Sequence, residues 1–471
     1  MNKYQTVALN TVYVLFGTVG SKLIFFFLLP LYTRWLGTEE YGATDAITVY
    51  TSVLSSIVFL NIADAIFVCP KLAMSVLSKR AYFSSGLCFI AVMAIVGGVL
   101  LWLWDVCCPH SAGEMVLYKY KWQIWGVMAS SYLQSFIQGF ARSLDQLKVY
   151  SISGVILAVS VAGLSFLLVP RWGIFGYVYA LTMAQLITAL YTATVIRASH
   201  FFSLKSIRGN ALKDMLSYSV PLIPNSMMWW LINGFNRPLM EQQLGLASIG
   251  IYAVASRVSG VINSLSSVFG LAWGNSALSE YGKEGFERFF NNYLKMVATL
   301  YFLSCMCLVV FAGDIVRLFT TPAYYEASNY IPILSLGLIF SGISITIGGI
   351  FSAVKKSKYF FYASLWGGLA SVGSLILLMP HFGLYGVAVS LAISFFVIMV
   401  VRWYLASRYV NFQHFLYYLF LIVAFLVVYA NTVFVDSYLK YVVDLAVFGW
   451  IVLTVRDDLN KFVVVLFNRE S

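Results

Sequence analysis

One segment of this chain recurs about 208 residues further along, and almost everything around both copies is apolar. Residues 30–42 align without a gap with residues 238–250, and five of the 13 positions are identical. A second pair, residues 168–176 and 378–386, aligns at an offset of 210. Because the two offsets differ by only two residues, the chain is predicted to contain two copies of one folding unit.

Composition indicates what kind of unit is duplicated. The chain is 61% hydrophobic and only 10% charged, against roughly 25% charged residues in soluble domains. Apolar runs close to the roughly 20 residues that cross a bilayer as a helix recur 14 times. They cover residues 8–32, 42–68, 82–104, 116–140, 149–169, 174–196, 216–237, 249–273, 289–312, 330–354, 359–379, 384–407, 413–434 and 439–456.

These runs predict an all-α integral membrane protein of about 14 transmembrane helices. The first twelve form two six-helix lobes related by pseudo-two-fold symmetry, residues 1–205 and 206–410, and residues 411–471 add two further helices and a cytoplasmic tail. Six crossings per copy give both copies the same orientation, so the axis between them runs along the membrane normal. Facing lobes of this kind are the usual architecture of secondary transporters.

The distribution of basic residues predicts the orientation in the membrane. On the side that holds the N-terminus the connecting segments carry 20 Lys and Arg residues, against seven on the opposite side. Because positive charge gathers in cytoplasmic loops, both termini are expected in the cytoplasm. The same rule accounts for the net charge of +11 without nucleic-acid binding. Residues 1–10 have no cleavage-site pattern and are expected to lead into an uncleaved first helix.

Residue chemistry argues against an enzyme. None of the six cysteines forms a C-x-x-C pair and the four histidines are isolated from one another, so no metal site is predicted. The chain has no P-loop, G-x-S-x-G or H-E-x-x-H pattern, and no connecting segment is long enough for a catalytic domain. We therefore expect no catalytic residue, no cofactor, and transport driven by an ion gradient or by the substrate gradient.

Two cations within the predicted spans are candidate substrate ligands. Lys22 and Arg257 lie in the first and eighth spans, each on the order of 10–12 Å inside the non-cytoplasmic boundary. Ionisable groups cost free energy in hydrocarbon and usually face a cavity. Binding of an anionic substrate and pairing with a nearby polar group explain the two residues about equally well.

The seventh predicted span carries a candidate sugar-binding face. Pro221 and Pro224 are expected to kink this helix. Asn225, Trp229 and Asn233 follow at four-residue spacing on one face. Amides hydrogen-bond hydroxyl groups and an indole covers the apolar face of a pyranose, although polar contacts between helices explain the stripe about as well.

The second predicted span offers a weaker candidate for ion coupling. Asp64 and Asn61 stand near one end of it and have the oxygen ligands that Na⁺ or a proton would need. A structural role is favoured, because both lie near an interface where water and headgroups can solvate them.

The repeated motifs resemble a known family. Residues 29–42 look like the first external loop of the Wzx-type polysaccharide flippases. The run from Asn236-Arg237 to Arg257 resembles the second-lobe signature of the same family, in which an Asp-Arg pair often stands where this chain has Asn236-Arg237. The wider multidrug, oligosaccharidyl-lipid and polysaccharide (MOP) exporter superfamily also contains the lipid II flippases and the multidrug and toxin extrusion (MATE) transporters. The resemblance covers roughly residues 1–410.

The resemblance implies a flippase that moves undecaprenyl-diphosphate-linked oligosaccharide, such as an O-antigen repeat unit, across the bacterial inner membrane by alternating access. It implies a central cavity lined by the first, second, seventh and eighth helices, where Lys22 and Arg257 would meet the diphosphate, with Arg237 in the second-lobe signature. The partners it implies are the lipid-linked substrate, membrane lipids, Na⁺ or H⁺ as a coupling ion, and other polysaccharide-assembly proteins.

Two other classes remain as alternatives. A MATE-like, cation-coupled drug exporter shares the expected fold, but its cavity would prefer acidic and aromatic residues, whereas two deep cations favour an anionic substrate. A multi-span polymerase or glycosyltransferase handles the same lipid-linked sugars. It would need an extended external loop, which this chain lacks.

Overall fold

The computed structural model describes residues 24, 26–72, 75–107, 115–434, 444, 446–451 and 453. Within these ranges the regular structure is helical and contains no strand, as expected for an all-α membrane protein. Seven of the described helices are long and apolar enough to cross a membrane, and a bent pair makes an eighth candidate. The predicted spans 8–32 and 439–456 fall largely outside the described residues, so the total of 14 stays a prediction.

The chain divides into two compact units, Met1–Ala253 and Val254–Ser471. The predicted lobe boundaries near residues 205 and 410 concern the sequence repeat, and they stay predictions. The α-helices assigned to the first unit or shared across its boundary are α2 (Leu29–Trp35), α3 (Thr38–Val58), α4 (Ile62–Leu72), α5 (Val76–Cys107), α6 (Val116–Lys119), α7 (Lys121–Ser143), α8 (Leu147–Val195), α9 (Gly209–Ser219), α10 (Ile223–Asn233), α11 (Asn236–Gln243) and α12 (Leu246–Gly260). Short 3₁₀ turns cover Ala198–His200, Leu204–Ser206 and Val220–Leu222.

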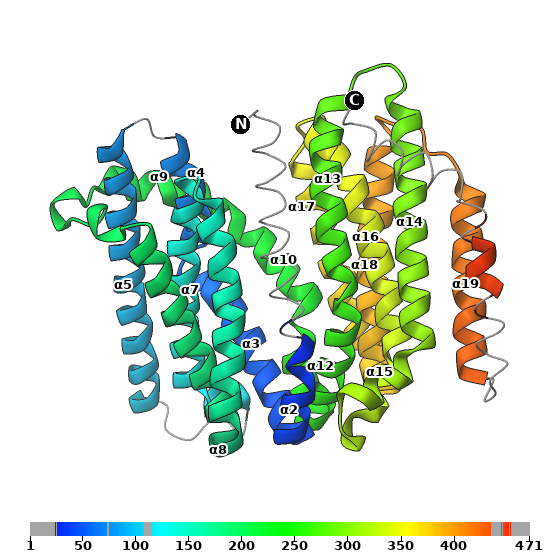
Figure 1. Ribbon diagram of the computed structural model, residues 1–471, viewed down its shortest axis with the longest axis horizontal. Helices are drawn as coiled ribbons and strands as arrows, with labels where there is room; N and C mark the ends of the chain where they lie inside the picture. The colour runs from blue at the N-terminus through cyan, green and yellow to red at the C-terminus, as the bar shows by residue number, and fades with distance from the viewer. Residues whose placement is uncertain are drawn as a thin grey trace. The chain divides into compact units, whose positions relative to one another are not determined.

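The core of the first unit is aromatic. Helices α4, α5, α7 and α9 pack against one another, and α5, α7 and α8 are drawn as long neighbouring columns in Figure 1. Phe59 stacks on Tyr132 with ring centroids 4.4 Å apart. Phe83 lies 4.5 Å from Phe140, and each of these phenylalanines is at most 2% exposed. Large rings therefore fill much of the space between these helices.

The second unit is built around α16 (Ile331–Ala353). Its other helices are α13 (Ile262–Glu280), α14 (Phe286–Val310), α15 (Ala312–Phe319), α17 (Lys358–Phe382), α18 (Leu384–Ala406) and α19 (Phe415–Phe434), with a 3₁₀ segment at Pro322–Asn329. Helices α13, α14 and α18 all pack on α16, while α17 packs on α18 and α19 on α14. Within this unit Figure 1 shows α19 at the edge of the bundle.

The two copies of the Pro-x-x-Gly motif adopt the same bend. Gly173 has φ 52° and ψ −125°, and Gly383 has φ 54° and ψ −130°. These positive φ angles favour glycine. At about 1.5 Å per residue, the 49 residues of α8 would be too long for one crossing of a core about 30 Å thick. The bend at Gly173 separates the predicted spans 149–169 and 174–196, as the one at Gly383 separates α17 from α18.

The other repeated glycines bring the two copies together. A Cβ atom added at Gly42 in α3 would overlap the carbonyl oxygen of Leu246 in α12, and one added at Gly250 would overlap that of Thr38. Gly42 and Gly250 are equivalent in the repeat, as are Thr38 and Leu246. The crossing is therefore reciprocal, and only glycine permits two helix backbones to approach this closely.

Both helices that carry sequence-predicted polar residues are interrupted. Leu60 and Asn61 have φ 51° and 53°, so the predicted span 42–68 consists of α3 and α4, bent by 51°. The predicted span 216–237 contains a 3₁₀ turn at Val220–Leu222 that includes Pro221, followed by α10 with Pro224 in its first turn. The prolines thus interrupt the helix where the sequence predicts it.

Candidate functional site

A polar groove lies between α3 and α10 in the first unit. It encloses about 360 Å³. On α3 the lining residues fall at positions 49, 52, 53 and 56, and on α10 at 226, 227, 229, 230 and 233, so each helix presents one face to the groove. The lining consists of Val49, Ser52, Val53, Ser56, Ser226, Met227, Trp229, Trp230, Asn233 and Gly234. We call this cavity the α3–α10 groove.

One of the two indoles of the groove, that of Trp230, lies against the end of α10. Gly234 closes the end of α10, and a Cβ there would come within 2.7 Å of Trp230 and 2.9 Å of Val49. The missing side chain lets the Trp230 ring lie across the helix end. The Nε1–H of Trp230 is buried and donates to no acceptor among the described residues. A donor of this kind beside a cavity is suited to an oxygen atom of a ligand.

The bend between α3 and α4 orients one hydroxyl of the groove. The Asn61 amide donates to Ser226 Oγ over 3.0 Å, and this hydroxyl donates to the Leu222 carbonyl over 3.3 Å. Asn61 is 7% exposed, so its amide is held in place. Asn61 itself has a positive φ of 53°, at the bend that separates α3 from α4.

A buried ion pair stands at the C-terminal end of α10. Arg237 Nε donates to Asp45 Oδ2 over 3.0 Å, and the two side chains are 8% and 13% exposed. Arg237 Nη1 also donates to the Asn233 carbonyl and to Asn236 Oδ1, both over 2.8 Å. The guanidinium lies 4.9 Å from the centre of the Tyr252 ring, and the Asn236 amide donates to the Tyr252 hydroxyl. The pair joins α3, α11 and α12.

A second carboxylate extends this network. Tyr50 on α3 donates its hydroxyl proton to Glu241 Oε2 on α11 over 2.7 Å. The backbone N–H of Val116, at the start of α6, donates to the other oxygen of Glu241. Sequence reasoning did not single out Tyr50 or Glu241. No local pattern marks them, because their partners are 191 and 125 residues away.

The structure places the candidate ligands in different surroundings. Trp229 and Asn233 line the α3–α10 groove, whereas Asn225 lies in the first turn of α10 and is not among its lining residues. Arg237 is held by Asp45. Arg257 is half-buried on α12 in the second unit. Lys22 lies outside the described residues.

Asn61 and Asp64, the candidates for ion coupling, differ in their exposure. Asn61 is buried and contacts Ser226, whereas Asp64 is exposed on α4. They share a backbone hydrogen bond from the Asp64 N–H to the Asn61 carbonyl. Among the described residues no group of three or more His, Cys, Asp or Glu side chains is arranged to hold a metal ion.

Comparison with protein families gives two matches. The family described as polysaccharide biosynthesis protein matches residues 7–273, which is more than half of the chain. The MatE family matches residues 238–376. The two matches overlap around the second copy of the repeat.

Two curated proteins are similar over part of their length. The chain is 27% identical over 252 residues to the capsular polysaccharide biosynthesis protein CapF of Staphylococcus aureus, covering 50% of this chain and 62% of that protein. It is 22% identical over 272 residues to Lsg locus putative protein 1 of Haemophilus influenzae, covering 54% and 61%. The matches therefore span about three fifths of the length of these relatives.

Solved structures share the fold at low sequence identity. The lipid II flippase MurJ in an inward closed conformation superposes with a TM-score of 0.67 at 17% identity, over 94% of this chain and 98% of that one. An inward-facing MATE family multidrug resistance transporter of the MOP superfamily gives 0.66 at 14% identity, over 82% and 94%. These neighbours are transporters and a flippase rather than enzymes, and the likeness shows that the chain shares their fold.

Proposed function

Since the chain belongs to the polysaccharide biosynthesis protein family and shares its fold with a lipid II flippase, we propose that it is a flippase for a lipid-linked oligosaccharide. The family membership confirms the expectation from the repeated loop motifs. In the proposed reaction the oligosaccharide crosses the membrane on its polyprenyl diphosphate carrier by alternating access, and no glycosidic bond is made. The finer expectation is an O-antigen or related surface-polysaccharide repeat unit carried across a bacterial inner membrane, with both termini cytoplasmic.

The observation that carries the proposal is the lining of the α3–α10 groove. Three serine hydroxyls, one amide and two indoles face one cavity of about 360 Å³. Hydroxyls and amides both donate and accept hydrogen bonds, as a sugar requires, and indole faces cover its apolar side. A cavity this small holds part of an oligosaccharide, because typical ligand pockets measure roughly 300–1,000 Å³.

The charges around the groove favour a neutral glycan over a cationic drug. No Asp, Glu, Lys or Arg is among the described side chains that line it. In the network at the end of α10, Asp45 is paired with Arg237, and Glu241 accepts hydrogen bonds from Tyr50 and Val116. A site for organic cations would need an uncompensated carboxylate.

The diphosphate ligands remain those proposed from the sequence, Lys22 and Arg257. Arg can bridge two phosphate oxygens whereas Lys acts as a point charge. Arg257→Lys should therefore impair export and Arg257→Ala impair it more, while Lys22→Arg retains activity. Arg237 is proposed to act on substrate through Asn233, whose carbonyl it holds. Wild-type export by a folded Lys22→Ala, Arg257→Ala variant would refute the diphosphate assignment.

A deletion strain distinguishes the candidate functions. Loss of a flippase should leave complete, unpolymerised repeat units on the lipid carrier in the cytoplasmic leaflet. Surface lipopolysaccharide capped with a single repeat unit would instead indicate a polymerase, because units would already be translocated. Unchanged surface glycan together with new sensitivity to cationic drugs would indicate a drug exporter, the alternative that the MatE match raises.

A further inference from the structure

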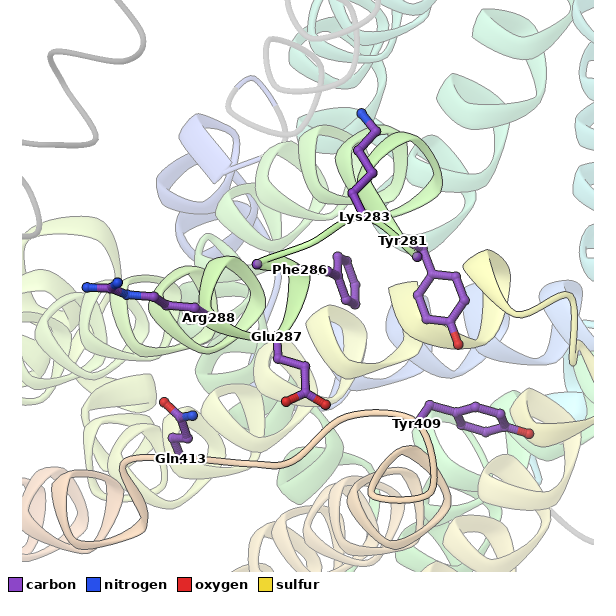
Figure 2. A pocket seen from close by; sticks show the side chains of 9 residues that line it. Tyr281, Lys283, Phe286, Glu287, Arg288, Tyr409 and Gln413 are labelled. Carbon is purple, nitrogen blue, oxygen red and sulfur yellow. The ribbon is translucent and has the colours of Figure 1, made fainter.

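The second unit contains a pocket that the flipping reaction does not use. It lies between the turn that joins α13 to α14 and the linker that joins α18 to α19, and it encloses about 510 Å³. Figure 2 shows Tyr281 and Tyr409 on one side, with Arg288 and Gln413 on the other. We call it the basic pocket, because Lys283 and Arg288 are the cations that line it.

The walls of the basic pocket are fixed by hydrogen bonds. Asn291 on α14 is fully buried. Its amide donates to the Asn411 carbonyl over 2.9 Å, and its carbonyl oxygen accepts from the Gln413 N–H over 2.8 Å. These bonds hold the α18–α19 linker against the first turns of α14, so the pocket persists without a ligand.

Two cations and one carboxylate line the basic pocket, and Figure 2 shows Lys283 and Arg288 extending outward from its rim while Glu287 points inward. Glu287 accepts a hydrogen bond from the Asn411 N–H over 3.4 Å, which engages one oxygen of the only lining carboxylate. Lys283 pairs with Glu280 over 2.9 Å, but the two side chains are 60% and 40% exposed, so this pair costs little to open.

A second group of cations stands at the edge of the basic pocket. The lining residue Tyr409 has its hydroxyl 3.3 Å from that of Tyr359. Arg408 directly precedes Tyr409 in the linker, and Lys356 and Lys358 stand close to Tyr359 in the sequence at the start of α17. These three residues add positive charge to the segments beside the pocket.

An aromatic layer lies directly beside the basic pocket. Phe412, in the linker, stacks on Trp403 of α18 with ring centroids 4.1 Å apart. It also contacts Phe290 of α14 edge to face at 5.6 Å. Indole and phenyl rings next to cations mark the headgroup level of a membrane. The pocket lies at the ends of three helices that are apolar enough to span the bilayer.

We propose that the basic pocket binds the phosphate headgroup of an anionic membrane lipid. Lys283 and Arg288 attract the phosphate from the rim of the pocket, and Gln413 and the phenols of Tyr281 and Tyr409 donate hydrogen bonds to its oxygens. The neighbouring aromatic layer accounts for a lipid rather than a soluble anion, because it gives the acyl chains an apolar path. The site goes beyond the flipping function, and its assignment to the cytoplasmic leaflet rests on the distribution of basic residues along the sequence.

Lipid binding to the purified full-length protein tests the proposal. Native mass spectrometry and thermal unfolding in detergent would be recorded with added phosphatidylglycerol, phosphatidylcholine, inorganic phosphate or a polyprenyl diphosphate. Phosphatidylglycerol should bind and raise the unfolding temperature, and phosphatidylcholine should not. Each of Lys283→Gln and Arg288→Gln should weaken phosphatidylglycerol binding roughly fivefold, and the double change about 25-fold. Arg288→Lys keeps the charge and should retain most of the binding.

A matched control separates the pocket from general surface charge. Lys205→Gln, Lys213→Gln removes two exposed cations of the first unit and should leave phosphatidylglycerol binding unchanged. Equal losses in both double variants would overturn the proposal, as would equal binding of phosphatidylcholine. Inorganic phosphate as effective as the lipid would indicate a soluble-anion site, and binding of only the polyprenyl diphosphate would indicate a substrate site. These readouts do not depend on export, so their failure would leave the proposed function untouched.

Discussion

The two copies of the repeat agree in their backbone packing and differ in their charges. Gly42 and Gly250 occupy equivalent positions, and at each of them the backbone of the other copy's helix lies too close to leave room for a Cβ atom. Arg237 and Glu241, however, stand where the first copy has Leu29 and Thr33. Asp45 and Tyr50 correspond to Ala253 and Val258 in the second copy. Duplication explains the shared backbone packing. The polar network, however, pairs Asp45 and Tyr50 of the first copy with Arg237 and Glu241 of the second, and the equivalent positions carry no charge.

This difference assigns separate roles to the two sets of residues. Residues that serve the crossing must satisfy the same steric condition in both copies, so the sequence keeps them identical. A substrate that differs from end to end, with a diphosphate at one end and a glycan at the other, needs unlike side chains on the two halves. The asymmetric ion pair at the end of the α3–α10 groove fits that requirement.

The largest effect is expected from breaking the asymmetric ion pair. Arg237→Ala leaves Asp45 buried and unpaired, which should lower the free energy of unfolding by about 3–5 kcal/mol. The neutral double variant Asp45→Asn, Arg237→Gln should recover most of that stability, because its amides can hydrogen-bond without net charge. Thermal unfolding of the purified proteins checks both. Equal stability of the single and double variants would show that the pair makes no mutual contribution.

An intermediate effect is expected at the symmetric crossing. Gly42→Ala and Gly250→Ala should destabilise the protein by similar amounts, about 1–3 kcal/mol each, since each forces two backbones apart. Gly126→Ala on α7 is the matched control, because a Cβ there meets no atom within 4 Å. Unfolding temperatures would give the ranking. A large difference between Gly42→Ala and Gly250→Ala would contradict the reciprocal geometry.

A smaller effect, confined to transport, is expected in the groove. Trp229→Ala should reduce export about tenfold, the effect of losing about 1.4 kcal/mol of substrate affinity. Trp229→Phe should retain more activity, because an aromatic face remains. Trp366→Ala provides the control, since that indole is 56% exposed on α17 and lies far from the groove in sequence. Export measured at matched protein levels would reveal whether the groove matters more than a surface tryptophan.

The smallest effect is expected from the residue that orients a groove hydroxyl. Asn61→Ala removes the hydrogen bond to Ser226 and should lower export about two- to threefold, because one bond at the lower end of the usual range contributes about 0.5 kcal/mol. Asp64→Asn, at the exposed end of α4, should change export less than Asn61→Ala if Asp64 has no part in ion coupling. A complete loss in Asp64→Asn would restore it as a coupling residue.

Much of the fold could be predicted from the sequence, because its signals are local or repeated. Apolar runs fix the helices, Pro221 marks the interruption before α10, and Gly173 and Gly383 mark matching bends. The bend at Leu60 and Asn61 carries no such signal, since neither residue is glycine or proline. The number of 14 spans depends partly on residues outside the described ranges.

The site was only partly predictable, for a physical reason. Trp229 and Asn233 could be found because four-residue spacing places them on one helical face. Ser52 and Ser56, which complete the groove, come from a helix about 170 residues earlier, and one sequence does not reveal which helix faces which. The same limit hid the pairing of Asp45 with Arg237, although both charges stand out within apolar surroundings.

Translocation in reconstituted vesicles tests the central claim most directly. The purified protein would be placed in liposomes that contain a polyprenyl-diphosphate-linked oligosaccharide, and the fraction open to an added glycosidase would be followed over time. The account predicts that the inner-leaflet pool becomes accessible with the wild-type protein and about tenfold more slowly with Trp229→Ala. A pool that stays protected with the wild-type protein, while the same vesicles transport a cationic dye, would contradict it.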